Sequence, residues 1–322
     1  MNVLVTGGAG FLGQRLARQL LQIGHLRGKD GRLKPIEQLT LVDIVPAPDL
    51  GDPRVRVITG DISDGVLLAY LIDRDCQSLF HLAAVVSSQA EAEFELGMRI
   101  NVEASRLLLD TCRQVGHCPR VVFTSSVAVY GGALPEVVDD ATALYPQSSY
   151  GTQKAIAELL LADYTRKGYV DGRVLRLPTI SVRPGKPNKA ASSFASGIIR
   201  EPLSGNISIC PVTAATRLWL MSPQKAIDAL VAGHDVPGAA LGQQRSINLP
   251  GICVSVGEMV DALARIAGPE AAASVQFQPD AEIQRIISSW ATQWDTARAE
   301  ALGLRGDADI DALIHAYRSS AP

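Results

Sequence analysis

Three glycines near the start of the chain restrict its fold more than any other feature. The β-branched run Asn2–Thr6 predicts a buried strand, and Gln14–Leu21 has the apolar pattern of a helix. A G-x-x-G-x-x-G loop at this junction lets the backbone approach a pyrophosphate, to which the helix N-terminus offers free N–H groups. The chain is therefore predicted to be α/β, with a dinucleotide site at its first strand–helix turn. The loop residues expected to bind the cofactor are Gly7, Gly10, Phe11, Leu12 and Gly13.

An acidic residue closes the second predicted strand. Asp43 follows Leu39–Val42, thirty residues past Gly13, where about twenty is usual. The polar segment Gly28–Pro35 reads as a surface insertion that accounts for the difference. Asp43 is expected to accept hydrogen bonds from the ribose hydroxyls, and its charge disfavours a 2′-phosphate, so we predict NAD over NADP. The alternative is an ordinary carboxylate that caps the strand end.

Two further strands are expected to end beside the same cofactor. Val55–Ile58 leads to Asp61 and Ile62, and Leu79–Ala84 ends in small residues. Because ligands of an open parallel sheet lie across the carboxyl ends of its strands, both endings should line the site. Asp61 suits the adenine amino group. The remaining cofactor contacts expected here are Ile62, Leu82, Ala83 and Ala84.

Longer helical patterns follow these strands. Gln89–Val115 reads as one helical region with Asn101 in its middle, where an asparagine is unfavourable unless its amide bonds another group. Asn101 is therefore expected near the site, in a structural, water-holding or cofactor-binding role. Val256–Ala267 and Ala291–Ala301 read as amphipathic helices near the C-terminus.

A tyrosine and a lysine four residues apart are the candidate catalytic groups. On a helix, Tyr150 and Lys154 share one face. The cation is expected to favour the phenolate and to bring the tyrosine's pKa towards neutral. Ser126 ends the predicted strand Val121–Ser126, whose hydroxyls point to the same edge of the sheet. Taken alone, the Tyr-x-x-x-Lys spacing is also that of a solvated helix face.

Composition excludes other classes of protein. The net charge of -3 and the pI near 6.0 disfavour nucleic-acid and membrane-surface partners. The five cysteines form no Cys-x-x-Cys pair, so we expect reduced thiols, a cytoplasmic protein and no metal site. No leader pattern and no uncharged run long enough for a membrane span is found.

Together these motifs resemble the extended short-chain dehydrogenase/reductases, a family that includes nucleotide-sugar epimerases and dehydratases. The residues that carry the resemblance are Thr6–Gly13, Asp43, Gly60–Ile62, Asn101, Thr124–Ser126, Val129–Gly131, Tyr150 and Lys154. The resemblance implies a doubly wound NAD-binding Rossmann domain over residues 1–181 and a smaller substrate-binding lobe over 182–322, from which some segments return to the sheet. It also implies Ser126, Tyr150 and Lys154 as the catalytic set, cofactor contacts from Thr124, Pro178 and both Tyr150 and Lys154, and a homodimer.

Residues in the second half of the chain indicate which class of substrate is expected. Thr179 stands where nucleotide-sugar members carry an asparagine for the diphosphate. The runs Arg183–Phe194, Ser196–Leu203 and Ile247–Pro250 resemble the D-erythronate 2-dehydrogenases. A small anionic sugar acid needs a cation for its carboxylate. The candidates are Lys186, Lys189 and Arg217, of which Lys189 and Arg217 are preferred, with Ser126 and Tyr150 completing the substrate site.

We therefore expect NAD-dependent oxidation of a small 2-hydroxy sugar acid, D-erythronate first. Two alternatives stay open at this point. A nucleotide-sugar epimerase or dehydratase would use the same three residues with permanently held NAD, and a non-enzymatic NAD sensor would keep the glycines and Asp43 alone.

Overall fold

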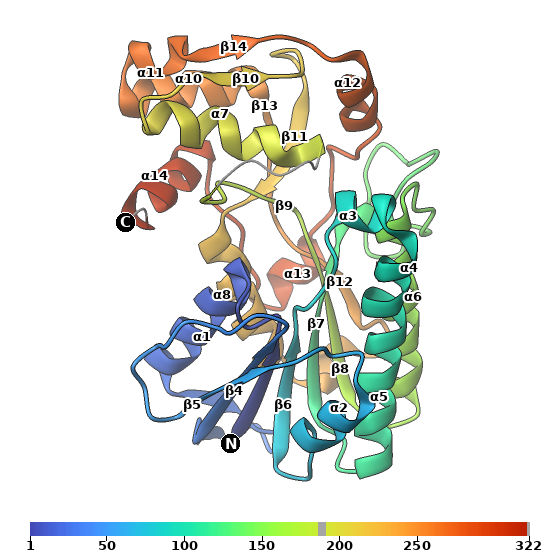
Figure 1. The fold of residues 1–322 in the computed structure, drawn as a ribbon. Coiled ribbons are helices and arrows are strands. Elements are labelled where there is room, and N and C mark those ends of the chain that lie inside the picture. Colours follow the sequence, from blue (N-terminus) through green and yellow to red (C-terminus); the bar gives the residue numbers. More distant parts are fainter. Residues whose placement is uncertain (186–190, 321–322) are drawn as a thin grey trace.

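A seven-stranded sheet in which every pairing is parallel forms the base of the molecule. The computed structural model describes residues 1–185 and 191–320, and the sheet runs in the order β12-β8-β7-β6-β1-β4-β5 (Figure 1). β1 lies between β4 and β6, so the strand order reverses there, and ligands bind at such a reversal in open sheets. The predicted doubly wound α/β fold is confirmed. The strands are β1 (Asn2–Thr6), β4 (Gln38–Asp43), β5 (Val55–Thr59), β6 (Cys76–His81), β7 (Arg120–Ser126), β8 (Asp171–Leu177) and β12 (Ser246–Asn248).

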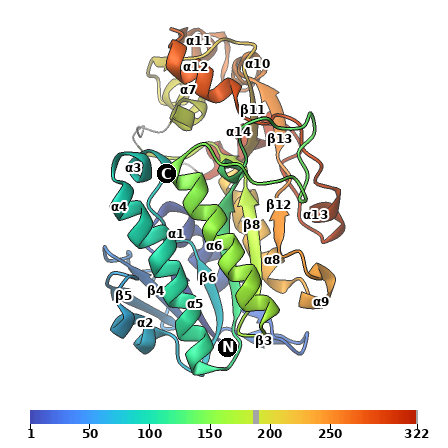
Figure 2. The ribbon, with the colours of Figure 1, turned by 90° about the vertical axis from the view of Figure 1, so that its right-hand side faces the viewer.

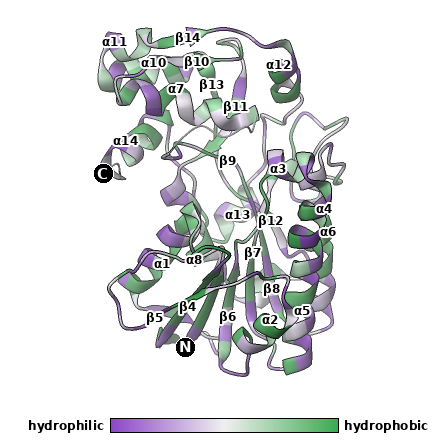
Figure 3. Cartoon of the chain, in the orientation of Figure 1, coloured by the Kyte–Doolittle hydropathy of each residue, from purple (hydrophilic) through white to green (hydrophobic). Residues whose placement is uncertain are grey.

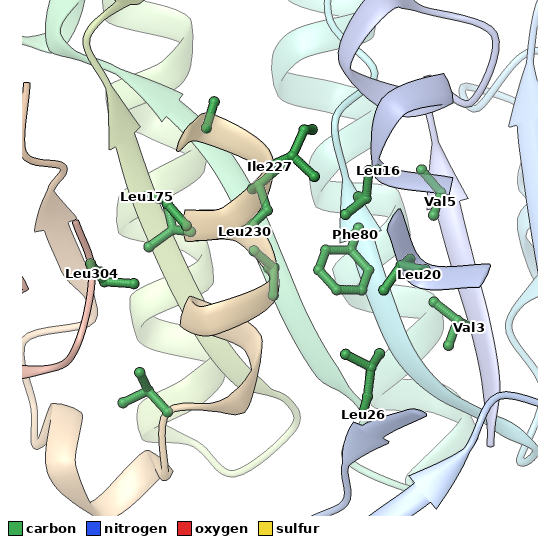
Figure 4. Packing of buried hydrophobic residues seen from close by; sticks show 14 of the residues in the cluster. Val3, Val5, Leu16, Leu20, Leu26, Phe80, Leu175, Ile227, Leu230 and Leu304 are labelled. Atoms are coloured by element: carbon green, nitrogen blue, oxygen red, sulfur yellow. The ribbon is translucent and has the colours of Figure 1, made fainter. Parts of the chain in front are cut away.

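Helices cover both faces of this sheet because its central strands bury apolar side chains on both sides. The hydropathy colouring shows mainly hydrophobic residues along these strands (Figure 3). Alternate residues of β1 point to opposite faces. Val3 and Val5 therefore pack with α1 and α8 (Figure 4). Leu4 instead belongs to the core shared with α2, α5 and α6. These helices are α1 (Phe11–Ile23), α8 (Pro223–Asp235), α2 (Gly65–Leu71), α5 (Ala104–Val115) and α6 (Ser149–Arg166).

A smaller lobe with its own core lies beyond the carboxyl ends of the sheet strands (Figures 1 and 2). It contains the three-stranded sheet β13-β11-β9 and the pair β10-β14. Its strands are β9 (Thr179–Ile180), β10 (Ser208–Cys210), β11 (Arg217–Met221), β13 (Ile252–Ser255) and β14 (Val275–Phe277). Its helices are α7 (Phe194–Leu203), α10 (Val256–Ala267), α11 (Pro269–Ala273), α12 (Ala281–Ser288) and α14 (Ile310–Ser320).

The chain crosses between the two parts several times. β9 leads from β8 into the smaller lobe, α8 returns to the sheet, and β12 later adds the edge strand beside β8. α13 (Ala297–Ala301) also returns, since Arg298 Nη1 donates to the carbonyl oxygen of Ser246 at 2.9 Å. The large sheet is thus completed by residues from the second half of the sequence.

One predicted helical region is helical nearly throughout but divided into several pieces, and a second is wrong in extent. The region 89–115 is divided into α3 (Ser87–Ala92), α4 (Phe94–Gly97), a π-helical turn η1 (Met98–Glu103) and α5. The region 291–301 is helical only at α13, because residues around Trp294 run extended and pair with Val138. In both regions tertiary contacts override the apolar periodicity.

Other expectations about local structure are met. The segment before β4 is a surface hairpin of β2 (His25–Arg27) and β3 (Leu33–Pro35), as the predicted insertion requires. α10 begins and ends where its pattern predicts, because Ser255 and Glu258 form a capping box at its start. Within residues 1–185 and 191–320, no helix combines the length and apolar character needed to cross a bilayer.

Candidate active site

The glycine loop presents an uncapped helix end at the carboxyl edge of β1. Gly10 is the N-cap of α1, is exposed, and supplies no side chain to the first N–H groups of the helix. Gly13 packs against the loop so closely that a Cβ there would lie 2.1 Å from the carbonyl oxygen of Gly7. The loop is therefore a tight cradle whose free donors suit a pyrophosphate. Phe11 and Leu12 lie in the first turn and are partly exposed.

Asp43 ends β4 beside this loop. Its Oδ2 accepts a hydrogen bond from the Ala9 N–H at 3.1 Å, and its side chain is partly exposed. The carboxylate is thus held against the glycine loop, and its ribose contact stays a prediction.

Asp61 has partners that the sequence did not predict. Its carboxylate pairs with Arg99 Nη1 at 2.7 Å and accepts hydrogen bonds from the backbone N–H and the hydroxyl of Ser63. Burial raises the pKa of Asp61, but these contacts outweigh it and the net shift is downward. Ile62 is buried in the core behind it. The contact of Asp61 with adenine stays a prediction, and the Asp61 carboxylate is already paired with Arg99.

The end of β6 lies directly against the glycine loop. The backbone N–H of Leu82 donates to the carbonyl oxygen of Thr6, and that of Ala83 donates to the Thr6 hydroxyl. Leu82, Ala83 and Ala84 are all partly exposed. The structure therefore brings these predicted cofactor contacts together with Gly7, whose nearest neighbour is Ala83.

Asn101 has a structural role within the buried interior. Its Oδ1 accepts from the Val85 N–H at 2.8 Å, and its Nδ2 donates to the Val85 carbonyl oxygen and to Gln153 Oε1. The side chain is buried in the π-helical turn. Of its predicted roles, the structural one is visible: the amide ties the chain after β6 to the helix that carries Tyr150.

The predicted catalytic residues lie on two elements in close contact. Ser126 ends β7 and its Oγ accepts the Ala128 N–H at 3.1 Å, which caps the short 3₁₀ helix η2 (Val127–Val129). α6 starts against this turn, because a Cβ at Gly151 would lie 2.1 Å from the Ala128 carbonyl oxygen. The Ser148 hydroxyl caps α6 and places Tyr150 in its first turn. Tyr150 and Ser126 are both partly exposed.

Lys154 is buried beneath the tyrosine. Its Nζ donates to the Thr124 carbonyl oxygen at 2.9 Å and lies 5.7 Å from the ring centre of Tyr150. The Thr124 hydroxyl donates to the carbonyl oxygen of His81, so Thr124 links β7, β6 and α6. The predicted set Ser126, Tyr150, Lys154 and Thr124 is thus brought to the same edge of the sheet as the glycine loop.

The pKa of the tyrosine differs from the expected direction. Burial raises the pKa of Tyr150 to about 12, and the cation that opposes this shift is Arg183. Burial also lowers the pKa of Lys154 to about 7, against the charge of Glu158. The expectation that Lys154 brings the phenol towards neutral is therefore wrong for this geometry, because desolvation outweighs the effect of a neighbouring cation.

The predicted substrate residues are less well gathered. Arg217 begins β11 and is 48% exposed, with Cys253 and Glu258 as partners. Pro178 is buried just past β8. The candidates Lys186 and Lys189 lie outside the described residues. Sequence reasoning missed Arg183, whose charge acts on Tyr150, and Glu158, which follows Lys154 by one helical turn, a spacing that could have indicated it.

The site fits a dinucleotide, since it combines the uncapped glycine loop, the Asp43 carboxylate and the buried Lys154. Residues 3–222 match the model of the NAD dependent epimerase/dehydratase family. The chain belongs to this family. NAD is accordingly its cofactor.

Individual relatives of this family are similar over the full length of the chain. A D-erythronate dehydrogenase of Cupriavidus necator is 60% identical over 321 residues, which cover 100% of this chain and 99% of that protein. A D-erythronate dehydrogenase of Haemophilus influenzae is 44% identical, with 98% of each chain covered. A crystal structure described as a nucleoside-diphosphate-sugar epimerase from Agrobacterium tumefaciens has a TM-score of 0.94 and 39% identity, and the match covers 99% of this chain and 94% of that one.

Replacing Gly13 by alanine tests the cradle in this member of the NAD-dependent family. The new Cβ would meet the backbone of Gly7, so the loop must move away from its present path. We expect the Kd for NAD, measured by titration calorimetry, to rise about tenfold or more. Gly65→Ala is the matched control, because a Cβ there meets only the Leu107 side chain at 3.7 Å. Equal NAD affinity in both variants would contradict the prediction.

Proposed function

We propose that this protein is an NAD-dependent dehydrogenase that oxidises D-erythronate at C2 to the 2-keto acid. The observation that carries the proposal is the full-length 60% identity to the Cupriavidus D-erythronate dehydrogenase. The geometry supports it, because a partly exposed phenol, a hydroxyl and a buried ammonium lie at one edge of the sheet beside the cofactor cradle.

In this proposal, Ser126 orients the substrate. Its Oγ already accepts the Ala128 N–H, so its own proton is free to be donated to the C2 oxygen. Tyr150, in its phenolate form, takes the proton of the C2 hydroxyl as that O–H bond breaks and becomes a neutral phenol. When bound, NAD would supply the oxidising power as the acceptor of the C2 hydrogen and its electron pair.

Lys154 holds its position through one of its three N–H donors. That donor is committed to the Thr124 carbonyl oxygen at 2.9 Å, which leaves two for the nicotinamide ribose or for the phenolate. Because Lys154 is buried, the phenolate that forms beside it experiences a weakly screened positive charge.

The test is a panel of four- and five-carbon aldonates assayed with free NAD. We expect NADH absorbance to appear with D-erythronate at the highest initial rate. A nucleotide-sugar epimerase with retained NAD, which the Agrobacterium description suggests for that protein, would give no net NADH from any aldonate. That outcome, together with turnover of a nucleotide sugar, would reject the dehydrogenase proposal.

We further propose that the protein is a cytoplasmic homodimer that associates through α6. Ile156, Leu159 and Leu160 form an apolar strip on this helix at i, i+3 and i+4 spacing. Leu159 is 67% exposed, although other residues of this helix are buried in the core. The five free cysteines support the cytoplasmic location.

Leu159→Glu tests the dimer. Wild-type protein should elute in light-scattering chromatography at twice the 34.2 kDa chain mass. The variant should elute as a monomer, because two carboxylates would face each other across the interface. Ile207→Glu, an equally exposed apolar position in the smaller lobe, should leave the mass unchanged. A monomeric wild-type protein would exclude this proposal.

A further inference from the structure

Arg183 lies where the chain leaves the sheet for the smaller lobe. Leu177, the last residue of β8, pairs with Ser126, and Arg183 follows six residues later, after β9. The intervening residues are anchored, since the Ser181 N–H donates to the Met221 carbonyl oxygen at 3.0 Å. The segment thus starts at the candidate catalytic serine and runs along β11.

Two side chains of α7 fix the backbone of Arg183. Its N–H donates to Ser196 Oγ at 3.1 Å, and Arg200 Nη1 donates to its carbonyl oxygen at 2.8 Å. Val182 beside it is buried in the core of the smaller lobe. The backbone of Arg183 is therefore held by the packed lobe.

The guanidinium of Arg183 has no anionic partner among residues 1–185 and 191–320. It is half-buried, yet none of the carboxylates in that part of the chain forms an ion pair with it. The nearby Arg200 is already neutralised by Glu201, with Nη2 and Oε1 2.6 Å apart. Burial and the charge of Arg200 lower the pKa of Arg183. An anion bound here would relieve an unmatched, partly desolvated charge.

Arg183 also acts on the candidate base. Its charge opposes the upward pKa shift of Tyr150, and Tyr150 in turn raises the pKa of Arg183. The path of the chain supports this proximity. The strand that leads to Arg183 ends beside Ser126, and the turn after Ser126 packs against the start of α6, which carries Tyr150. In a 2-hydroxy acid, the carboxylate and the reacting hydroxyl are on adjacent carbons. A cation that binds the carboxylate must consequently lie beside the group that takes the hydroxyl proton.

Arg217 meets these requirements less well. It is already bonded to the Cys253 carbonyl oxygen at 3.1 Å, and the Glu258 carboxylate lies 3.8 Å from its Nη1. A neighbouring carboxylate repels an anionic substrate and partly cancels the positive charge. Its exposure also lets water screen the interaction.

We propose that Arg183 binds the carboxylate of the substrate and so directs the C2 hydroxyl towards Tyr150. This inference rests on the proposed function, since it assigns the residue that recognises the acid. It makes Arg183 the determinant of selectivity for 2-hydroxy acids over neutral polyols or amides of the same length.

Steady-state kinetics of three variants test the assignment, with D-erythronate and its neutral amide as substrates. We expect Arg183→Gln to raise KM for D-erythronate about 10- to 100-fold, with little change for the amide and none in the Kd for NAD. Arg183→Lys should raise KM for D-erythronate by a smaller factor, because lysine keeps the positive charge but cannot form the two parallel hydrogen bonds of a guanidinium with a carboxylate. Arg217→Gln, the matched control, should retain the wild-type preference for the acid.

Chemical rescue separates recognition from a folding defect. Millimolar guanidinium chloride should restore part of the D-erythronate activity of Arg183→Ala and leave Tyr150→Phe inactive. An unchanged acid-to-amide preference in Arg183→Gln, or its loss in Arg217→Gln instead, would overturn the assignment.

A further measurement keeps this inference distinct from the proposed activity. If wild-type protein gives no NADH from D-erythronate, the proposed function fails by itself. Glycolate, the simplest 2-hydroxy acid, can then be titrated calorimetrically onto the NAD complexes of wild type and Arg183→Gln. Weaker glycolate binding by the variant would support the anion site, and equal binding would refute it.

Discussion

Replacing Tyr150 by phenylalanine is expected to reduce kcat/KM for D-erythronate by roughly 10²- to 10⁴-fold, the usual contribution of a positioned acid–base group. The phenyl ring keeps the packing at the start of α6 but cannot accept the hydroxyl proton. The Kd for NAD, measured by titration calorimetry, should stay close to that of wild type. Turnover within tenfold of wild type would remove Tyr150 from the role of base.

The pH profile provides a second measure of the same group. Because burial raises the pKa of Tyr150 to about 12, the phenolate is a minor form at neutral pH. The reactive fraction should grow as protons are removed, so kcat/KM should rise from neutral to mildly alkaline pH. Lys154, whose pKa is about 7, loses its charge over the same interval, so the rise should be less than tenfold per pH unit. A profile that is flat over this interval would show that a different group, or a different step, limits the rate.

Replacing Glu158 by glutamine is expected to lower the free energy of unfolding by about 3–5 kcal/mol, the usual cost of leaving one partner of a buried ion pair alone. Glu158 and Arg176 are almost fully buried, and their closest atoms, Oε2 and Nη2, are 2.7 Å apart. The pair joins α6 to β8, and the Ser246 hydroxyl of β12 also donates to Glu158. Urea unfolding followed by circular dichroism measures the loss.

A double variant identifies the cause of that loss. In Glu158→Gln/Arg176→Met the Arg176 guanidinium is absent and cannot be left unpaired. The free energy of unfolding of the double variant should therefore fall by less than the sum of the losses in the two single variants. A single-variant loss below about 1 kcal/mol would match an exposed ion pair and would contradict the importance of burial here. Glu158→Gln should also lower the pKa of Lys154 further, since the charge of Glu158 opposes the effect of burial.

Local chemistry explains why some of the site could be predicted from sequence. The glycine loop is fixed by a strand ending and a turn that neighbouring residues specify. Asp43 can be recognised as the acidic residue that ends a buried strand, and its bond to Ala9, 34 positions away, was not needed for that prediction. The start of helix α10 follows from its capping box of Ser255 and Glu258, and a glycine, Gly268, stands just after its last residue. These features depend on short-range geometry, for which a residue type and a spacing are sufficient.

The missed features depend on contacts between distant residues. Arg99 pairs with Asp61 across 38 positions, and the residues around each of them do not indicate that the two side chains meet. Asn101 interrupts a long helix with a π-helical turn because its amide reaches Val85 and Gln153. The direction of the Tyr150 pKa shift follows from burial, which a spacing of four residues does not reveal.

The repeated passage of the chain between its two parts bears on how new specificities could be engineered. β12 and α8 come from the second half of the sequence, yet they complete the sheet that holds the cofactor cradle. A chimera joined once after residue 181 would therefore exchange the edge strand and a covering helix together with the substrate lobe. Replacing only the smaller lobe by that of a relative would require a separate junction at each point where the chain crosses between that lobe and the large sheet.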